Sequence, residues 1–519
     1  MHANAIKIVK RLALLVLLSQ LLGCGDEFGV TASSASEVKQ LTEGQVTGID
    51  SPFDGAITVF RGLPYAEPPV GDLRWQAPQP PANWSGVRMA DTFADSCHQP
   101  RHSSSFVWRR EDFPVSEDCL YLNIWAPESA EKLPVMVWFH GGSHVSGQGH
   151  SLIFDGTTLA QHDVLVVTIN YRLGPLGFLA HPWLSEEAAS DSAVGTSGNY
   201  GLMDKIAALQ WVKRNIEVLG GDPQNVTIFG QSAGSQSVCS LMTAPSAQGL
   251  FHKAIGQSAA CVNQLTKADA NGHERGQALV NALGASSIED LRGAEPDALL
   301  VAMTKSNWES DSRIVIDGRV LPRWPHEVFA AGEQSDIPLM LGFLADEGYE
   351  LFEVESALTE AELQGFLEYV GGKRAAELKA EYDAASMTPG ELKHAISTDL
   401  FMAYGMRQWA SYHADAGQDT YLYFMGHVPP AFHIYMPDQP FLALEEGPRS
   451  GGAYHSGDLA YVFGTIDKVG YDWTDMDRMV SAQMMAHWTR FARTGNPNVP
   501  GKSDWPAFDT VDLHTRVIN

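Results

Sequence analysis

Short apolar runs alternate with longer amphipathic stretches along most of the chain. Several of these runs show no alternation of polar and apolar positions, which is typical of strands buried on both faces of a sheet. They cover residues 134–140, 164–171, 226–230, 253–257, 337–343 and 420–425. Between two of them, residues 201–219 place apolar side chains at helical spacing, which predicts a helix packed on the sheet. The pattern predicts an α/β fold with a large, mostly parallel central sheet and helices on both faces.

A hairpin signal precedes this alternating region. Two β-prone runs, residues 45–49 and 56–60, flank the turn-forming pair Asp54-Gly55. After the first 40 residues, no internal repeat and no proline- or serine-rich linker interrupts the sequence. We therefore expect an N-terminal β-hairpin and a single domain over residues 41–519.

The first residues carry an export signal. Basic residues precede an apolar run over residues 12–22, which is too short to span a bilayer comfortably. The run ends in Leu-Leu-Gly-Cys24, which resembles the lipobox of bacterial lipoproteins. We expect a signal peptide over 1–23, a flexible tether over 24–40 and a lipid on Cys24 that anchors the exported protein to a membrane, facing the periplasm or the exterior. An ordinary signal peptide that ends near a cysteine is the alternative.

Composition and charge narrow the range of partners. The 519 residues include 62 acidic and 35 basic ones, which gives a formal net charge of −27. Such an acidic surface repels phosphate backbones, which argues against nucleic acid as a partner and against electrostatic docking on anionic lipid. A neutral or weakly cationic small substrate is compatible with this charge. The hydrophobic share of 44% permits a large core.

The cysteines indicate an oxidising compartment. There are five, and assigning Cys24 to lipid leaves an even number for pairing. Cys97 and Cys119 are the better pair, because they close a short loop whose restriction contributes about 3 kcal/mol in the loop-entropy model. Cys239 and Cys261 either form a second disulfide or remain as buried thiols.

A candidate nucleophile follows one of the predicted strands. Residues 230–234 read Gly-Gln-Ser-Ala-Gly, with the apolar strand 226–229 before them and a helical stretch to about Met242 after them. This is the setting of a nucleophile elbow, in which a sharp turn projects the Ser232 hydroxyl out of the sheet near the positive end of a helix. A near copy of the motif around Ser258 lacks the last glycine and has no clear helix after it, so we interpret Ser258 as a structural residue.

A glycine pair ahead of the elbow has matching chemistry. His140, Gly141, Gly142 and Ser143 directly follow the predicted strand 134–139. Glycines at that point let backbone N–H groups face a developing oxyanion. A simple Gly-Gly turn is the alternative. Together with the elbow, the pair indicates acyl-transfer chemistry.

From about residue 41 to its end, the chain resembles the type-B carboxylesterase and cholinesterase family. The segments that carry the resemblance stand in family order. They are residues 61–66 with 68–71, 117–124, 199–202 through 225–227, and 491–497. The resemblance implies an α/β-hydrolase fold and a serine carboxylesterase that hydrolyses small-molecule esters through an acyl-enzyme. It implies neither a metal nor an organic cofactor, and no clustered His/Cys spacing in the sequence suggests a metal.

The serine needs a histidine that accepts its proton. In α/β-hydrolases the acid follows the serine and the histidine comes last in the chain. His455 fits because small residues on both sides form a loop able to reach the elbow, and the family's motif points to the same residue. His433 is the rival, although its proline-rich, aromatic setting is more typical of a pocket wall.

The histidine in turn needs a carboxylate that fixes its tautomer. Asp346 and Glu347 both follow the predicted strand 337–343, and position alone does not choose between them. The family's matching motif uses the glutamate, so Glu347 is expected to be the acid and Asp346 a structural neighbour. Asp399 and Asp458 are lesser candidates with structural roles.

The resemblance also assigns the oxyanion hole and reveals departures from the family. Its donors would be the N–H groups of Gly142, Ser143 and Ala233. The family usually has glutamate where this chain has Gln231, and the neutral amide should weaken attraction for cationic substrates such as choline esters. Ser143 replaces a glycine or alanine, and His144 stands where an aromatic residue is common, so both are expected to narrow the substrate pocket.

Two aromatic-rich segments, residues 101–113 and 421–441, are expected to border the active-site gorge. The candidates for an apolar pocket wall are Trp108, Phe424, Phe432 and Tyr435. Ordinary core or rim packing is the alternative for each of them.

Two other functions are compatible with parts of this pattern. A binding protein with the same fold but no chemistry is disfavoured, because Ser232, Glu347 and His455 are all present. Amide hydrolysis or acyl transfer to an alcohol shares the acyl-enzyme with ester hydrolysis and stays open.

Overall fold

The computed structural model describes most of the chain after the N-terminal segment. The described residues are 35–100, 113–191, 195–262, 272–308, 313–348, 358–382, 386–432, 451–469, 472–502 and 504–519. The expected signal peptide, Cys24 and most of the expected tether lie outside them, as do Trp108, His433 and Tyr435. Among the helices of the described part, none is long and apolar enough to cross a membrane.

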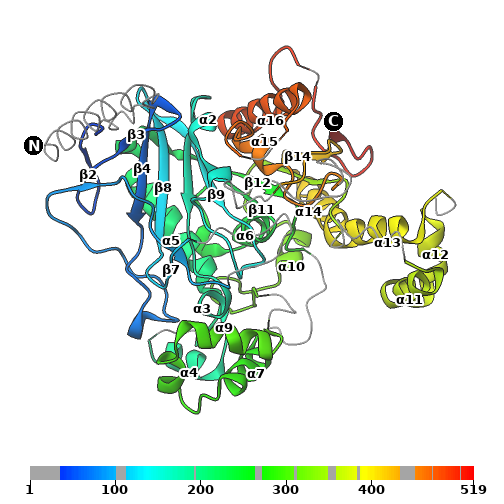
Figure 1. Cartoon of the computed structure of the whole chain (residues 1–519), viewed down its shortest axis with the longest axis horizontal. Coiled ribbons are helices and arrows are strands. Elements are labelled where there is room, and N and C mark those ends of the chain that lie inside the picture. The colour runs from blue at the N-terminus through cyan, green and yellow to red at the C-terminus, as the bar shows by residue number, and fades with distance from the viewer. Residues whose placement is uncertain are drawn as a thin grey trace, which may run out of the picture.

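A ten-stranded sheet forms the centre of the molecule (Figure 1). Its strands, in spatial order, are β15 (Thr515–Ile518), β14 (Thr420–Met425), β13 (Leu339–Leu344), β12 (Lys253–Gln257), β11 (Gly221–Gln231), β9 (Leu133–Phe139), β10 (Leu165–Ile169), β8 (Tyr121–Pro127), β4 (Asp54–Pro64) and β3 (Ile49–Ser51). Pairing is parallel from β15 to β10 and antiparallel from there to β3. Every apolar run that predicted a strand forms one, which confirms the mostly parallel sheet.

Helices cover both faces of the sheet, as predicted. Alternate side chains of β9 belong to different cores, with Val137 in the core that includes α5 (Tyr200–Asn215) and Trp138 in the core that includes α16 (Asp475–Thr494). The predicted helix over 201–219 is confirmed, although its last turn, Ile216–Leu219, is a 3₁₀ helix. A strand buried on both faces has no polar side to show, which explains why its sequence lacks alternation.

The remaining elements are short and lie around this framework. The helices are α2 (Thr157–Ala160), α3 (Gly174–Phe178), α4 (Pro182–Asp191), α6 (Ala233–Leu241), α7 (His273–Leu283), α8 (Ile288–Arg292), α9 (Pro296–Lys305), α10 (Pro325–Ala330), α11 (Glu360–Gly371), α12 (Ala375–Ala380), α13 (Pro389–Thr398), α14 (Tyr404–Asp415) and α15 (Leu459–Phe463). The small strands are β1 (Lys39–Gln40), β2 (Gln45–Thr47), β5 (Val87–Met89), β6 (Ser96–Cys97) and β7 (Val115–Ser116).

The N-terminal hairpin exists, but its predicted boundaries are wrong. The first β-prone run divides at Gly48: β2 joins a separate three-stranded sheet with β1 and β5, whereas β3 joins the central sheet beside β4. Asp54-Gly55 lies inside β4, whereas the turn falls on residues 52–53. A Cβ on Gly48 would lie 2.6 Å from the Val59 carbonyl oxygen. The passage of the chain from β2 to β3 therefore requires a residue without a side chain.

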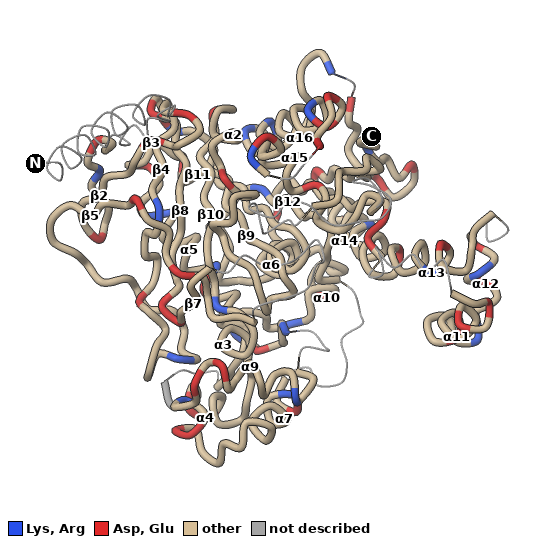
Figure 2. Tube along the Cα trace, viewed as in Figure 1, with Lys and Arg blue, Asp and Glu red and all other residues tan. Residues whose placement is uncertain are grey.

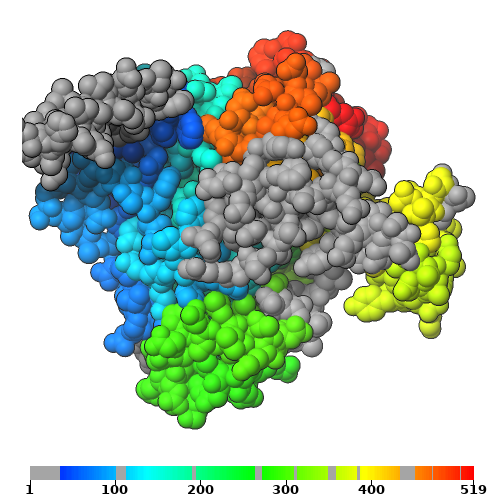
Figure 3. Space-filling view, in the orientation of Figure 1, coloured from blue at the N-terminus to red at the C-terminus, as the bar shows by residue number. Residues whose placement is uncertain are grey.

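Helices α11 to α13 project from the body of the molecule and have a small core of their own (Figure 3). Both α11 and α13 begin with a capping box, which fixes their starts. A π-helical turn over Asp399–Ala403 joins α13 to α14 and so connects this projection to the body. Such turns are uncommon inside helices and frequently occur at functional sites.

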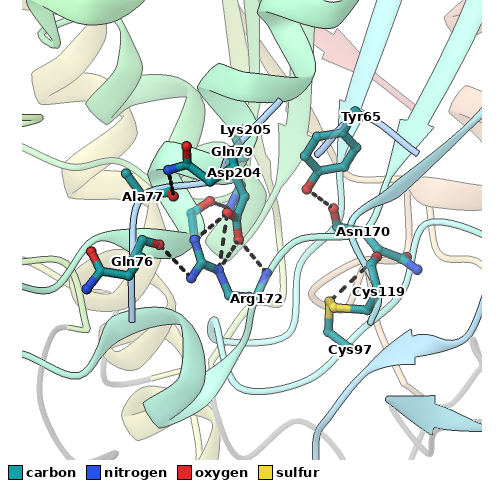
Figure 4. Close-up of polar contacts among 11 residues, drawn as sticks. Tyr65, Gln76, Ala77, Gln79, Cys97, Cys119, Asn170, Arg172, Asp204 and Lys205 are labelled. Atoms are coloured by element: carbon teal, nitrogen blue, oxygen red, sulfur yellow. Dashed lines mark hydrogen bonds and ion pairs between the residues drawn. A yellow bond between two sulfur atoms is a disulfide. The ribbon is translucent and has the colours of Figure 1, made fainter. Parts of the chain in front are cut away.

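A buried ion pair holds the segment after β10 against α5 (Figure 4). Arg172 and Asp204 lie 2.7 Å apart, and the Asp204 side chain is fully buried. The Arg172 backbone N–H also donates to this carboxylate. Removing one member of such a pair leaves an uncompensated buried charge, which costs about 3–5 kcal/mol.

Two disulfides link neighbouring segments. The predicted bond joins Cys97 to Cys119, and Cys239 and Cys261 also pair, which resolves the open alternative for them.

Charged residues lie mainly around the periphery, while the centre around β9 and α6 has almost none (Figure 2).

Candidate active site

Ser232 stands at a sharp turn between the end of β11 and the start of α6. Its φ of 55° and ψ of −124° lie in a region that non-glycine residues rarely adopt. The glycines on either side permit this turn: a Cβ on Gly230 would lie 2.6 Å from the carbonyl carbon of Gly234, and one on Gly234 would overlap the carbonyl oxygen of Phe139. The predicted strand–turn–helix setting of the elbow is therefore confirmed.

Backbone hydrogen bonds hold the turn on both sides. The Ser232 N–H donates to the Gln257 carbonyl at 2.8 Å, and its own carbonyl accepts from Gln236 at 2.9 Å. Ala233 opens α6, where the first N–H groups have no partner within the helix and carry the positive end of its dipole. This places a backbone donor directly beside the serine.

The glycine loop after β9 lies against the elbow. A Cβ on Gly141 would lie 3.1 Å from the Cβ of Ser232, so the loop backbone approaches the serine closely. The following residues, Gly142, Ser143 and His144, have φ values of 107°, 55° and 58°. Consecutive left-handed residues cost free energy, and strain of this kind typically concentrates at functional sites.

His455 reaches the elbow from a loop after β14. Its Nδ1 lies 3.5 Å from Oε1 of Glu347, whose side chain is fully buried. Its Nε2 lies 3.1 Å from the amide nitrogen of Gln231, the residue before Ser232. A neutral imidazole with its proton on Nδ1 suits both neighbours, because it faces the carboxylate with a donor and the amide with a lone pair.

The two adjacent carboxylates after β13 have different surroundings. Asp346 accepts from the Ala453 N–H at 2.7 Å and donates its own N–H to the Ala453 carbonyl at 3.0 Å, so it fastens the His455 loop. Burial opposes ionisation of Asp346, but hydrogen bonds from His394 and Ala453 lower the pKa of this carboxyl. Glu347 faces His455 instead, which favours it over Asp346 as the acid.

The lesser candidates lie in structural positions. Asp458 is buried beneath the site, where it accepts from Gln257 at 2.7 Å and from the Tyr423 hydroxyl at 3.1 Å. Burial, together with the charge of Glu347, raises the pKa of Asp458 to about 6. Asp399 accepts from the Tyr382 hydroxyl in the projecting helices.

Ser258, the near copy of the nucleophile, is fully buried at the end of β12. Its N–H donates to the Gly342 carbonyl at 2.9 Å. Within the described part of the chain, its hydroxyl has no hydrogen-bond partner. These surroundings favour the structural interpretation.

The predicted pocket residues lie in different surroundings. Phe432 is 2% exposed and packs against Trp473, which favours the core interpretation, whereas Phe424 packs against Phe343 at the sheet and stays partly accessible.

The sequence missed Phe401, which is 44% exposed on the π-helical turn with its ring centroid 5.9 Å from that of His455. A π-helical turn leaves no periodic signal, so the sequence pattern did not indicate this contact.

A group of possible metal ligands lies elsewhere on the surface. Within the described residues, Asp509, Asp512 and His514 bring ligand atoms within 4.8 Å of one another. This cluster is at least partly exposed, precedes β15 and shares no residue with the site around Ser232.

Known proteins are similar to this chain over most of its length. The family model described as "Carboxylesterase family" matches residues 35–518. The para-nitrobenzyl esterase of Bacillus subtilis (strain 168) is 36% identical over 498 residues, which cover 92% of this chain and 95% of that protein. The fumonisin B1 esterase of Sphingopyxis macrogoltabida is 34% identical over 487 residues, with 91% and 84% covered.

Solved structures match as well. A PNB esterase structure has a TM-score of 0.78 at 33% identity, and the carboxylesterase EST55 of Geobacillus stearothermophilus has 0.78 at 32%. Each match covers 93% of this chain and 96% of the other. The similarity confirms the predicted α/β-hydrolase fold.

Proposed function

The chain belongs to the carboxylesterase family and hydrolyses carboxylic esters, and we propose that it does so with Ser232 as nucleophile, His455 as base and Glu347 as acid. The observation that carries this assignment is the meeting of three separate segments. Gln231, which directly precedes Ser232 at the end of β11, lies 3.1 Å from the His455 imidazole, and Glu347 after β13 lies 3.5 Å from it. Charge and position in this arrangement match the roles of a serine hydrolase triad.

Acylation begins when His455 accepts the Ser232 hydroxyl proton on Nε2 and the serine oxygen attacks the ester carbonyl carbon. The N–H groups of Gly142, Ser143 and Ala233 stabilise the resulting oxyanion. The carbonyl then reforms, the bond to the alcohol oxygen breaks, and His455 donates its proton to the departing alcohol. The acyl group is left on Ser232.

Deacylation repeats these steps with water. His455 accepts a proton from the water, whose oxygen attacks the acyl carbon, and the bond to Ser232 breaks as the serine recovers its proton. Glu347 stabilises the imidazolium in both halves of the reaction. No other group is needed for the balance of atoms and charge.

Covalent capture tests the nucleophile. A fluorophosphonate that phosphonylates activated serines should attach once, to the peptide that contains Ser232, as mass spectrometry would detect. Loss of esterase activity should follow the extent of labelling. Complete inactivation with the label on another serine would contradict the assignment.

We also propose that this esterase prefers neutral esters to cationic ones, because Gln231 contacts His455 without a charge. Gln231→Glu should raise the ratio of kcat/KM for a choline ester to that for the uncharged 3,3-dimethylbutyl ester of the same acid by about fivefold. This corresponds to ~1 kcal/mol of Coulomb attraction at short range. Stopped assays at low and high salt measure the ratio, and the gain should shrink as salt screens the charge.

The control places the same charge elsewhere. Gln248→Glu adds a carboxylate at an exposed position after α6 and should leave the ratio unchanged. An equal rise in both variants would show that net charge alone, and not position 231, sets the preference.

We further propose that the protein is exported and carries a lipid anchor on Cys24, a position supported by the apolar run and the Leu-Leu-Gly-Cys sequence that ends it. Cells fed radioactive palmitate should label the wild type and the tether variant Ser33→Ala, but not Cys24→Ser. The unlabelled variant should move from the membrane to the soluble fraction. Equal labelling of all three proteins would refute the anchor.

A further inference from the structure

The His144 side chain is buried between two helices beside the site. It is 2% exposed, and its ring packs against Phe178 of α3 with centroids 4.9 Å apart. Its carbonyl accepts the N–H of Gly174, the first residue of α3, at 2.7 Å. The residue directly after the oxyanion donor Ser143 is thus fastened to a neighbouring helix by both its backbone and its ring.

The imidazole also contacts the nucleophile helix. Nε2 of His144 lies 3.1 Å from Oε1 of Gln236, which is four residues after Ser232 on α6. Since a glutamine oxygen only accepts, His144 carries its proton on Nε2 and donates it. This single side-chain bond joins the loop that holds Gly142 and Ser143 to the helix that holds Ala233.

The surroundings keep His144 uncharged. Burial lowers the pKa of its imidazole well below the ordinary value, and the nearby Lys205 and Arg313 lower it further. Lys205 is itself buried 3.0 Å from the ring centre of Tyr171, whose hydroxyl donates to the His140 carbonyl at 2.7 Å (Figure 4 shows Lys205 beside the Arg172–Asp204 pair). A neutral donor keeps the same hydrogen bond across the working pH range of an esterase.

The loop needs such a fastening because its backbone is strained. Ser143 and His144 both hold left-handed φ values, which relax to ordinary ones unless the surroundings fix them. Relaxation would rotate the N–H groups of residues 142 and 143 away from the oxyanion. Catalysis is sensitive to such errors, since a displacement of about 1 Å can cost about 100-fold in rate.

We propose that the His144–Gln236 hydrogen bond is a positioning contact that holds the two halves of the oxyanion hole at their working separation. The proposal rests on the assignment of Ser232 and of the oxyanion donors given above. We assign the effect of both side chains to the backbone of the oxyanion donors that their hydrogen bond connects.

Four variants of the full-length enzyme test this contact. Gln236→Leu keeps the size of the side chain but removes the acceptor, whereas Gln236→Glu retains an acceptor oxygen. His144→Ala removes the donor, and the double variant His144→Ala/Gln236→Leu removes both partners. We expect kcat to fall about 10- to 100-fold in every variant except Gln236→Glu, with KM changed less than about threefold. The double variant should lose no more than the worse single variant, because both remove the same bond.

Inhibitors separate positioning from general damage. A trifluoromethyl ketone forms an oxyanion on the serine, and its affinity should fall by the same factor as kcat. An ether analogue of the substrate, which forms no oxyanion, should bind as before. The chain offers a matched control in buried His181, whose Nε2 lies 3.2 Å from Oε1 of Gln277. His181→Ala should lower Tm comparably and leave kcat unchanged.

Several results would overturn this inference and leave the triad assignment intact. One is a Gln236→Leu variant with kcat within about twofold of wild type, and another is equal weakening of ketone and ether binding. Additive losses in the double variant would also count against it. Failure of the underlying triad has a different signature, because Ser232→Ala would then remain active.

Discussion

Replacing Ser232 by alanine is expected to lower kcat/KM for simple esters by about 10⁵- to 10⁶-fold. The change removes the proposed nucleophile, and the remaining oxyanion donors and binding contacts would give only the residual acceleration typical of triad knockouts. The fold should survive, since the Ser232 backbone bonds to Gln257 and Gln236 do not involve the hydroxyl. Initial rates on a panel of esters with varied acyl and alcohol groups, together with thermal unfolding, measure both effects.

Ser258→Ala is the matched control for this experiment. Ser258 has the same preceding residues and a left-handed backbone with the same φ of 55°, but it lies buried at the end of β12. We expect its activity to stay within about twofold of wild type, because among the described residues its buried hydroxyl has no hydrogen-bond partner that could activate it. A large loss in the Ser258 variant with little loss in the Ser232 variant would reverse the assignment.

Glu347→Gln is expected to lower kcat by about 10⁴-fold at neutral pH. The amide is nearly isosteric, but it neither stabilises the imidazolium nor holds the proton on Nδ1 of His455, which the mechanism requires. Because the glutamate is fully buried, solvent does not replace its charge. Steady-state kinetics with ester substrates measure the loss, and a burst of released alcohol shows whether acylation or deacylation limits the variant.

Asp346→Asn provides the comparison that sequence position alone left open. This carboxylate fastens the His455 loop through the Ala453 N–H, so its replacement should lower the melting temperature and reduce kcat about tenfold or less. If Asp346→Asn were the more damaging change and Glu347→Gln nearly silent, Asp346 would be the acid.

The sequence predicted the central sheet well because its strands are buried on both faces. Such strands show as uninterrupted apolar runs, and all the predicted runs became strands of the ten-stranded sheet. The elbow was predictable for a different reason: Gly230 and Gly234 are required by close backbone contacts, so the steric constraint appears directly in the residue types.

Other features depend on contacts that local pattern does not encode. The N-terminal run divides at Gly48 because β2 finds partners in β1 and β5, and that choice is made by tertiary packing. The choice between Asp346 and Glu347 depends on which carboxylate faces His455. Because the two residues are adjacent in the sequence, their distance from the end of the strand does not distinguish them. The inward direction of His144 follows from its left-handed backbone and from Gln236 and Phe178, which lie far from it in sequence.

The disulfide between Cys239 and Cys261 ties the helix that begins beside Ser232 to the segment after the neighbouring strand β12. Bonds of this kind form and persist mainly in oxidising compartments. A molecule that folds without this cross-link would lose about 3 kcal/mol of unfolding free energy in the loop-entropy model. It would therefore resist heat and proteolysis less well. On the proposed export, the compartment in which folding ends would therefore determine how stable the finished enzyme is.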